Sequence, residues 1–179
     1  MTRIFLILAG LDALALAASV GVGAASKFGD HALFLDHFIL GLFTAILTLL
    51  VHCLIFIYFL GTGRWVKEVG LAYELPDAGL PHLTRELKRV TFPPALGSML
   101  LMIATVAAGA GADQAGWPWP IHFALALVTL AVNFWAFRIE YRNVRANGRI
   151  LDEVMREVDR IRAERGLPSN AEALQQDGV

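Results

Sequence analysis

Two ionisable residues lie deep inside long apolar stretches, where a charge is costly and therefore carries functional information. Asp12 lies in the first stretch and His52 in the second, which runs in the opposite direction. Each is roughly eight residues from the same membrane surface, so both should lie about 12 Å below it. We expect Asp12 and His52 to form an intramembrane polar pair that either stabilises the fold or exchanges a proton.

His37 and His122 form a second candidate pair, near the opposite surface and at similar depths of the second and fourth stretches. Two neutral imidazoles facing each other across a helical bundle are the usual axial ligands of a b-type haem. Gly41, one turn from His37, would leave room for a porphyrin. We commit to no cofactor from the sequence. If a haem is bound, we expect its iron to be the only metal. The alternative interpretation places both histidines in interfacial water.

Four apolar segments must position these residues, because a bilayer core of roughly 30 Å requires about 20 helical residues. The chain of 179 residues is 56% hydrophobic and only 17% charged, which argues against a water-soluble domain. Its net charge of -1 gives no indication of nucleic-acid binding. The expected spans are 4–24, 33–60, 94–112 and 120–137. The predicted fold class is all-α, an integral membrane four-helix bundle, and no internal repeat is expected.

Small and polar side chains recur at helical spacing along one face of each span, which predicts a partly polar bundle interior. The alternative is that the Ser and Thr hydroxyls bond only to their own backbone. The faces comprise Asp12, Ala15, Ser19 and Gly23; His37, Gly41, Thr44, Thr48 and His52; Gly97, Ser98, Thr105 and Gly109; and His122, Ala126, Thr129 and Asn133.

The distribution of positive charge predicts the orientation, because Lys and Arg are retained on the cytoplasmic side. All 15 Lys and Arg residues except Lys27 lie on the side that holds both termini. We therefore expect both termini in the cytoplasm, with the bacterial inner membrane as the simplest location. The first span resembles a signal peptide, but Asp12 interrupts its apolar core, so we do not expect cleavage.

The inner loop, the segment after span four and the C-terminal tail are expected on the cytoplasmic side. Residues 1–138 form the transmembrane domain, in which 61–91 is an inner loop. Residues 139–166 continue span four as an amphipathic cytoplasmic helix, and 167–179 form a flexible tail. Within that helix a short apolar stripe indicates either a brief coiled coil or docking on the inner loop. The stripe consists of Leu151, Val154, Val158 and Ile161.

Three functions fit this organisation. The first is a non-catalytic subunit or scaffold of a larger membrane complex, because the soluble parts are small and the helix faces need partners. Those partners would be the lipid bilayer and membrane proteins, or further copies of this chain, but not nucleic acid. The second is a b-type haem electron-transfer protein built on His37 and His122. The third is an enzyme acting on lipid or quinone through Asp12 and His52, although no familiar catalytic motif points to one.

Overall fold

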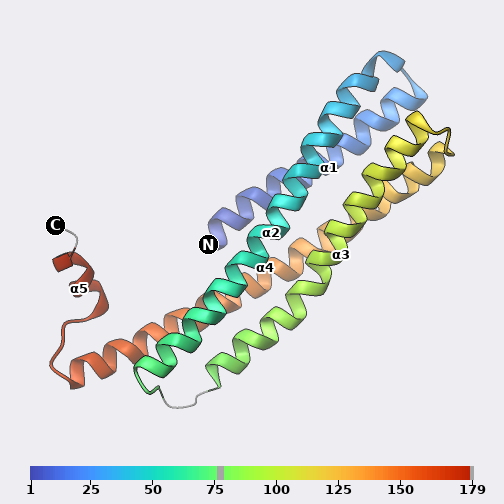
Figure 1. Ribbon diagram of the computed structural model, residues 1–179. Helices are drawn as coiled ribbons and strands as arrows, with labels where there is room; N and C mark the ends of the chain where they lie inside the picture. The colour runs from blue at the N-terminus through green and yellow to red at the C-terminus, as the bar shows by residue number, and fades with distance from the viewer. Residues whose placement is uncertain (76–78, 178–179) are drawn as a thin grey trace.

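The structure is a computed structural model that describes residues 1–75 and 79–177, and this part of the chain contains helices and no strands (Figure 1). A helix is the stable conformation for long apolar segments, because it satisfies its own backbone hydrogen bonds. The helices are α1 (Thr2–Phe28), the 3₁₀ turn η1 (His31–Leu33), α2 (Phe34–Ala72), α3 (Leu80–Gln114), α4 (Trp119–Glu164) and α5 (Asn170–Asp177).

Helices α1 to α4 are long enough and apolar enough to cross a membrane. Their outward faces carry large exposed apolar side chains, among them Leu14, Ile46, Ile57 and Leu100. Apolar surface of this extent is unsuited to water and typical of a multi-pass membrane protein. The prediction of an all-helical fold with four helices long and apolar enough to span a membrane is therefore confirmed for the residues that the structure describes.

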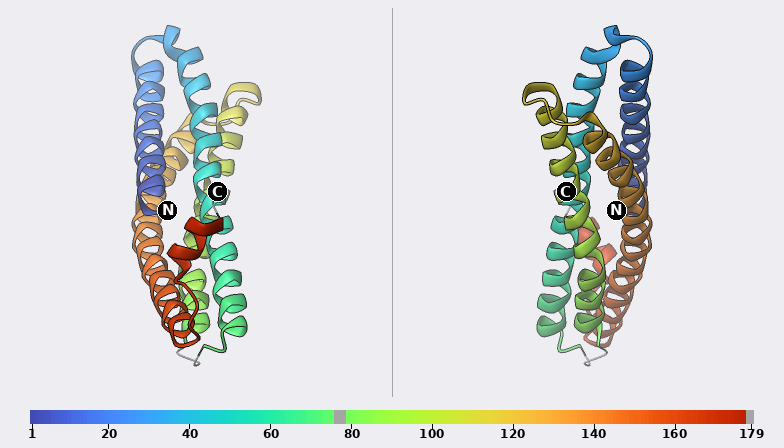
Figure 2. Two further views of the ribbon diagram at one scale, coloured as in Figure 1. Left: turned by 90° about the vertical axis from the view of Figure 1, so that its left-hand side faces the viewer. Right: turned by 90° about the vertical axis from the view of Figure 1, so that its right-hand side faces the viewer.

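The four long helices form a ring in which α1 packs on α2 and α4, and α3 packs on α2 and α4. We call the end with the turns after α1 and α3 the turn end, and the end where α2 stops and α3 begins the tail end (Figures 1 and 2). The N-terminus lies near the middle of the molecule's length (Figure 1). Helix α1 therefore covers only the half that includes the turn end.

The interior has two apolar clusters that follow this division. The cluster in the four-helix half includes Phe5 and Leu16 of α1 together with Ile55, Phe59 and Phe137. The cluster in the three-helix half joins α2, α3 and α4. Its buried members are Val66, Leu80, Ile150, Val154 and Val158.

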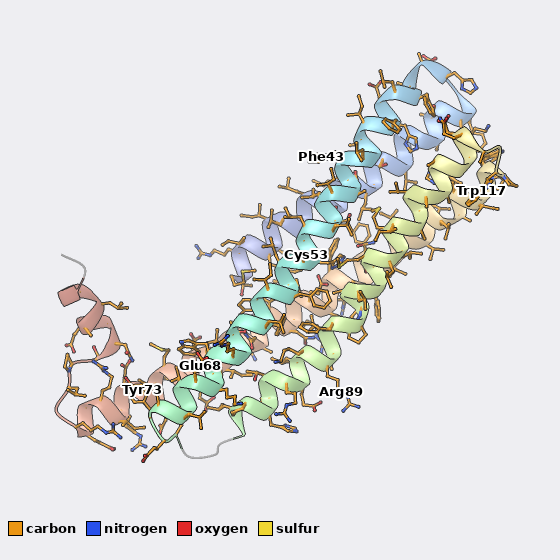
Figure 3. All side chains as sticks on the ribbon, viewed as in Figure 1. Phe43, Cys53, Glu68, Tyr73, Arg89 and Trp117 are labelled. Carbon is orange, nitrogen blue, oxygen red and sulfur yellow. The ribbon has the colours of Figure 1, made fainter. Side chains whose placement is uncertain are left out.

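The segment 61–91, expected to be a loop, is largely helical, since α2 continues to Ala72 and α3 begins at Leu80. The reason is packing: Val66 of α2 and Leu80 of α3 are buried against α4 in the second cluster. Residues 76–78 of this segment lie outside the described residues. Figure 3 places Arg89 on the part of α3 nearer the tail end, whereas Phe43 and Cys53 lie farther up α2.

Helix α4 runs without interruption through span four and the segment expected to follow it, ending at Glu164. Val154, Val158 and Ile161 of the predicted stripe are buried, and Leu151 packs on the second cluster. The stripe therefore packs inside this molecule, against α2 and α3. In the expected tail 167–179, residues 170–177 form α5, whose Asn170 bonds to Asp159 of α4; residues 178–179 lie outside the described part.

Candidate functional site

Buried polar side chains are concentrated inside the ring of helices rather than spread over its surface. Helix α4 contributes a row of them, Thr129, Asn133, Glu140 and Asn147, all buried. Their spacings of four and seven residues keep them on one helical face. This row faces residues of the other three helices and builds a polar axis along the bundle.

The centre of this axis is His52, whose two ring nitrogens both bind α4. His52 Nδ1 lies 2.7 Å from Glu140 Oε1, and His52 Nε2 lies 2.9 Å from Asn133 Oδ1. The imidazole also stacks on the ring of Phe137, with centroids 5.4 Å apart. His52 is therefore held by three residues of a single helix.

The hydrogen-bond pattern restricts the protons in this cluster. Asn133 Nδ2 donates to the backbone oxygen of Thr129 at 2.8 Å, so its Oδ1 faces His52 and accepts a proton from Nε2. The remaining contact, between Nδ1 of His52 and Oε1 of Glu140, then shares one proton between a base and an acid. The His52–Glu140 pair is electrically neutral whichever atom holds that proton.

Asp12 lies in the same layer but does not bond to His52 directly. Its Oδ1 accepts a hydrogen bond of 2.8 Å from Thr48, which precedes His52 by one turn of α2. His52 and Glu140 belong to the electrostatic surroundings of the Asp12 carboxyl group. The expected Asp12–His52 pair is thus a larger cluster, in which Thr48 and Glu140 are the direct partners.

Glu140 is the residue that the sequence interpretation missed. The sequence places Glu140 in the cytoplasmic helix beyond span four, which leaves Asp12 as the one carboxylate deep within the expected spans. In the structure Glu140 is 0% exposed. A signal was available, because Glu140 lies seven residues after Asn133 and so falls on the same helical face.

His37 and His122 come together near the turn end, as the sequence predicted. Their ring centroids are 6.0 Å apart, and the ring planes meet at 62°. Each Nδ1 lies near a backbone oxygen of the preceding helix: that of His37 is 3.2 Å from Ser19 O, and that of His122 is 2.9 Å from Thr105 O. Since a carbonyl oxygen only accepts, each Nδ1 carries the hydrogen and each Nε2 is left as the acceptor nitrogen.

Each of these imidazoles packs on a glycine of the preceding helix. A Cβ at Gly23 would lie 2.6 Å from Cε1 of His37, and a Cβ at Gly109 would lie 2.9 Å from Cε1 of His122. A side chain at either position would therefore have to displace the imidazole. Gly41 instead faces α1, since its Cβ would meet the hydroxyl of Ser19 at 3.6 Å.

The matching surroundings of the two histidines arise from an internal repeat. Residues 37–44 read HFILGLFT and residues 122–129 read HFALALVT, with His, Phe, both Leu and Thr in common. In the preceding helices Ser19, Val20 and Gly23 correspond to Thr105, Val106 and Gly109. The α1–α2 and α3–α4 hairpins thus share a repeated motif around their histidines, and the expectation of a chain without repeats is wrong at these positions.

Hydrogen bonds connect the histidine pair to the central cluster. The Thr105 hydroxyl donates to its own helix at Leu101 O, so the Thr129 hydroxyl donates to it across 2.6 Å. Thr105 also supplies the backbone oxygen for His122, and Thr129 supplies the one for Asn133. The polar axis therefore runs from the turn end through side chains and backbone oxygens of α3 and α4, and then through His52 of α2 to Glu140.

An apolar groove of about 360 Å³ lies between α2 and α3, alongside this axis. It is lined by Leu42, Ala45, Ile46 and Leu49 of α2 and by Met102, Ile103, Val106, Ala107 and Ala110 of α3. Ala110 is the neighbour of Gly109, so the groove reaches the level of His122. A second cavity of about 250 Å³ lies near the tail end, and neither is lined by Asp12 or His52.

The chemistry of this interior is acid–base chemistry at His52 and nitrogen ligation at His37 and His122. Within the described ranges, no group of three or more His, Cys, Asp or Glu side chains is placed to hold a bare metal ion. The free thiol of Cys53 is exposed on α2, outside the polar axis. No known protein family, curated protein or solved structure matches this chain.

Proposed function

We propose that this protein is a membrane-bound b-type haem protein that transfers electrons, and that His37 and His122 are the residues that would hold the haem. The observation that carries the proposal is the pair of imidazoles at 6.0 Å, each anchored through Nδ1 to a backbone oxygen. Ligating histidines usually donate their second nitrogen to a carbonyl, which fixes the tautomer and the ring orientation. The same arrangement leaves both Nε2 atoms for iron.

Haem suits this pair better than a bare metal ion does. Two protein ligands complete the coordination of a haem iron because the porphyrin supplies the others, whereas structural metal sites generally need more. The apolar groove between α2 and α3 reaches the level of His122 but is lined by neither histidine, so it supports the proposal only as apolar surroundings near the pair. When bound, the haem would supply a one-electron redox couple, and the chain would fix its ligands and exclude water.

The two other functions have less support. A non-catalytic subunit would account for the exposed apolar helix faces, but lipid accounts for them equally. An enzyme acting through Asp12 and His52 needs access to them, and both are fully buried. We therefore favour neither of these two functions. The expectation that the protein has partners in the membrane stays a prediction.

The proposed setting follows from the charge pattern. The tail end, the C-terminal part of α4 and Arg3 account for all 15 Lys and Arg residues except Lys27. By the positive-inside rule, both termini then face the cytoplasm of a bacterial cell. The haem site would lie near the opposite surface, within reach of an electron donor or acceptor on that side.

Absorption spectra of the purified full-length protein, produced with excess haem, test the proposal. We expect a Soret band and a b-type spectrum on reduction in the wild type, with His37→Ala and His122→Ala each losing most of the bound haem. His31→Ala and His82→Ala are matched controls, because these exposed histidines lie near the site and at the opposite end. A colourless wild type, or equal haem in all variants, would contradict the proposal.

A further inference from the structure

The buried layer of Asp12, His52 and Glu140 holds more ionisable groups than a structural contact needs, and its chemistry does not depend on haem. All three side chains are 0% exposed. One oxygen of each carboxyl group is hydrogen-bonded, to Thr48 for Asp12 and to His52 for Glu140. The other oxygens, Oδ2 of Asp12 and Oε2 of Glu140, are buried without a partner.

The net charge of this layer depends on whether Asp12 is protonated. The His52–Glu140 pair is neutral as a unit, as its shared proton requires. Helix α3 adds no compensating charge, because residues 90–112 contain no Asp, Glu, Lys, Arg or His, and its contribution to the buried polar groups here is the hydroxyl of Ser98. An ionised Asp12 would thus be a buried charge without a counter-charge, and such a group usually becomes neutral by binding a proton.

A comparison of the two hairpins shows that only the first one carries an acidic residue at this position. The position that corresponds to Asp12 in the second hairpin is Ser98, a neutral residue whose Oγ is also buried without a partner. The other hairpin therefore packs with a small hydroxyl where this one carries a carboxyl group. The acid at position 12 is not needed for hairpin packing as such, which points to a chemical role.

We propose that this layer is a proton-binding site in which Asp12 holds an exchangeable proton, next to the proton shared by His52 and Glu140. The step is a simple proton transfer: the carboxylic acid of Asp12 releases a proton and becomes a carboxylate, with no other bond changed. The groups that face Asp12 are Thr48 and His52 of α2 and Glu140 of α4. Asn143 and Asn147, bonded to Thr91 and Thr62, continue the polar face of α4 toward the tail end.

A small metal cation is the other ligand that two unpartnered carboxylate oxygens would attract. In the described part of the chain no group of three or more His, Cys, Asp or Glu side chains is placed to hold a metal ion, which favours the proton. A proton also needs no coordination shell.

Infrared spectroscopy of the full-length protein in lipid tests this site, because a protonated carboxylic acid has a C=O stretching band separate from the amide bands. At neutral pH we expect such a band in the wild type and its loss in both Asp12→Asn and Asp12→Ser. The serine variant copies Ser98, so its hairpin should still pack. Asp36→Asn and Asp113→Asn, at exposed positions, are matched controls that should keep the band.

The same spectra decide whether the proton exchanges. In D₂O the Asp12 band should shift before the buried helix amides exchange, and it should disappear reversibly when the pH is raised. The proposal is overturned by a wild type without the band, by a band whose intensity is unchanged in Asp12→Asn, or by a band that does not exchange. A band replaced on addition of sodium or potassium ions at constant pH would also overturn it in favour of a metal cation.

Discussion

The stability of the bundle depends strongly on the buried contact between His52 and Glu140. Both are fully buried, and their separation is 2.7 Å. Removing one partner of a buried ion pair leaves the other without compensation, whereas replacing both by apolar groups is often neutral or stabilising. The stability of the bundle should therefore depend on the pair being complete rather than on its being charged.

A double-mutant cycle tests this at the residue scale. Glu140→Leu should lower the free energy of unfolding by about 3 kcal/mol. The double variant His52→Phe with Glu140→Leu should recover most of that loss, because Phe137 occupies the position corresponding to His52 in the second hairpin. Unfolding in mixed detergent would measure both. If the double variant loses as much free energy of unfolding as the two single variants together, the pairing is contradicted.

The glycines beneath the histidines give a second residue-scale prediction. Gly23→Ala places a Cβ about where the His37 ring lies, so it should displace the imidazole, cost about 1–3 kcal/mol and weaken haem binding. Gly21→Ala is the matched control, since nothing lies within 4 Å of a Cβ there. Thermal unfolding and haem titration of both variants would compare them. Equal behaviour of the two would show that the close packing at Gly23 has no energetic consequence.

At the scale of the helices, the stability of the three-helix half depends on the part of α4 that follows the predicted fourth span. Val154 is 0% exposed and packs in the cluster that contains Val66 and Leu80. Val154→Ala should cost about 2 kcal/mol through the cavity it leaves, and Val154→Asp should cost more. Glu153→Ala, at an exposed position, should have little effect.

Hydrogen exchange of the backbone amides measures where this loss occurs. We expect Val154→Asp to increase exchange in α4 after residue 144 and in the ends of α2 and α3 that pack on it. Exchange near His37 and His122 should stay as in the wild type. Loss of protection throughout the bundle would mean that the two apolar clusters fold as one unit.

The sequence predicted the four long apolar helices well and the residues where those helices end poorly, for a physical reason. Hydropathy reports where lipid can surround a helix, so it located all four spanning helices. It does not report helix that continues beyond the apolar segment by packing on neighbours, as α2 and α3 do on either side of residues 73–79. Glu140 was missed for the same reason, since a charged residue after an apolar run looks like the end of a span.

The histidine pair was predictable because depth alone brought His37 and His122 together. Their environment was not, because Gly23, Gly109 and the carbonyl groups of Ser19 and Thr105 belong to other helices. The repeat that relates these environments is visible in the sequence once the two hairpins are aligned on their histidines. It was overlooked because most other positions of the two hairpins differ.

For the whole molecule, the repeat gives both hairpins the same direction across the membrane, so both turns should face one side. With Cys53 replaced by Ala, Asp113→Cys should react with a membrane-impermeant maleimide added to intact spheroplasts. Glu164→Cys should react only after the membrane is broken. Both sites are exposed, so accessibility to the reagent would report the side of the membrane alone. The reverse pattern would mean that the termini face outward.

The haem ligation at His37 and His122 is the central claim for the whole protein, and the electronic state of the iron tests it most directly. The measurement is electron paramagnetic resonance of the oxidised, full-length protein, together with a haem-to-protein ratio. We expect one haem per chain with the low-spin signal of two imidazole ligands, converted to high spin or lost in His37→Ala and in His122→Ala. A protein without haem, or a low-spin signal that survives both substitutions, would contradict it.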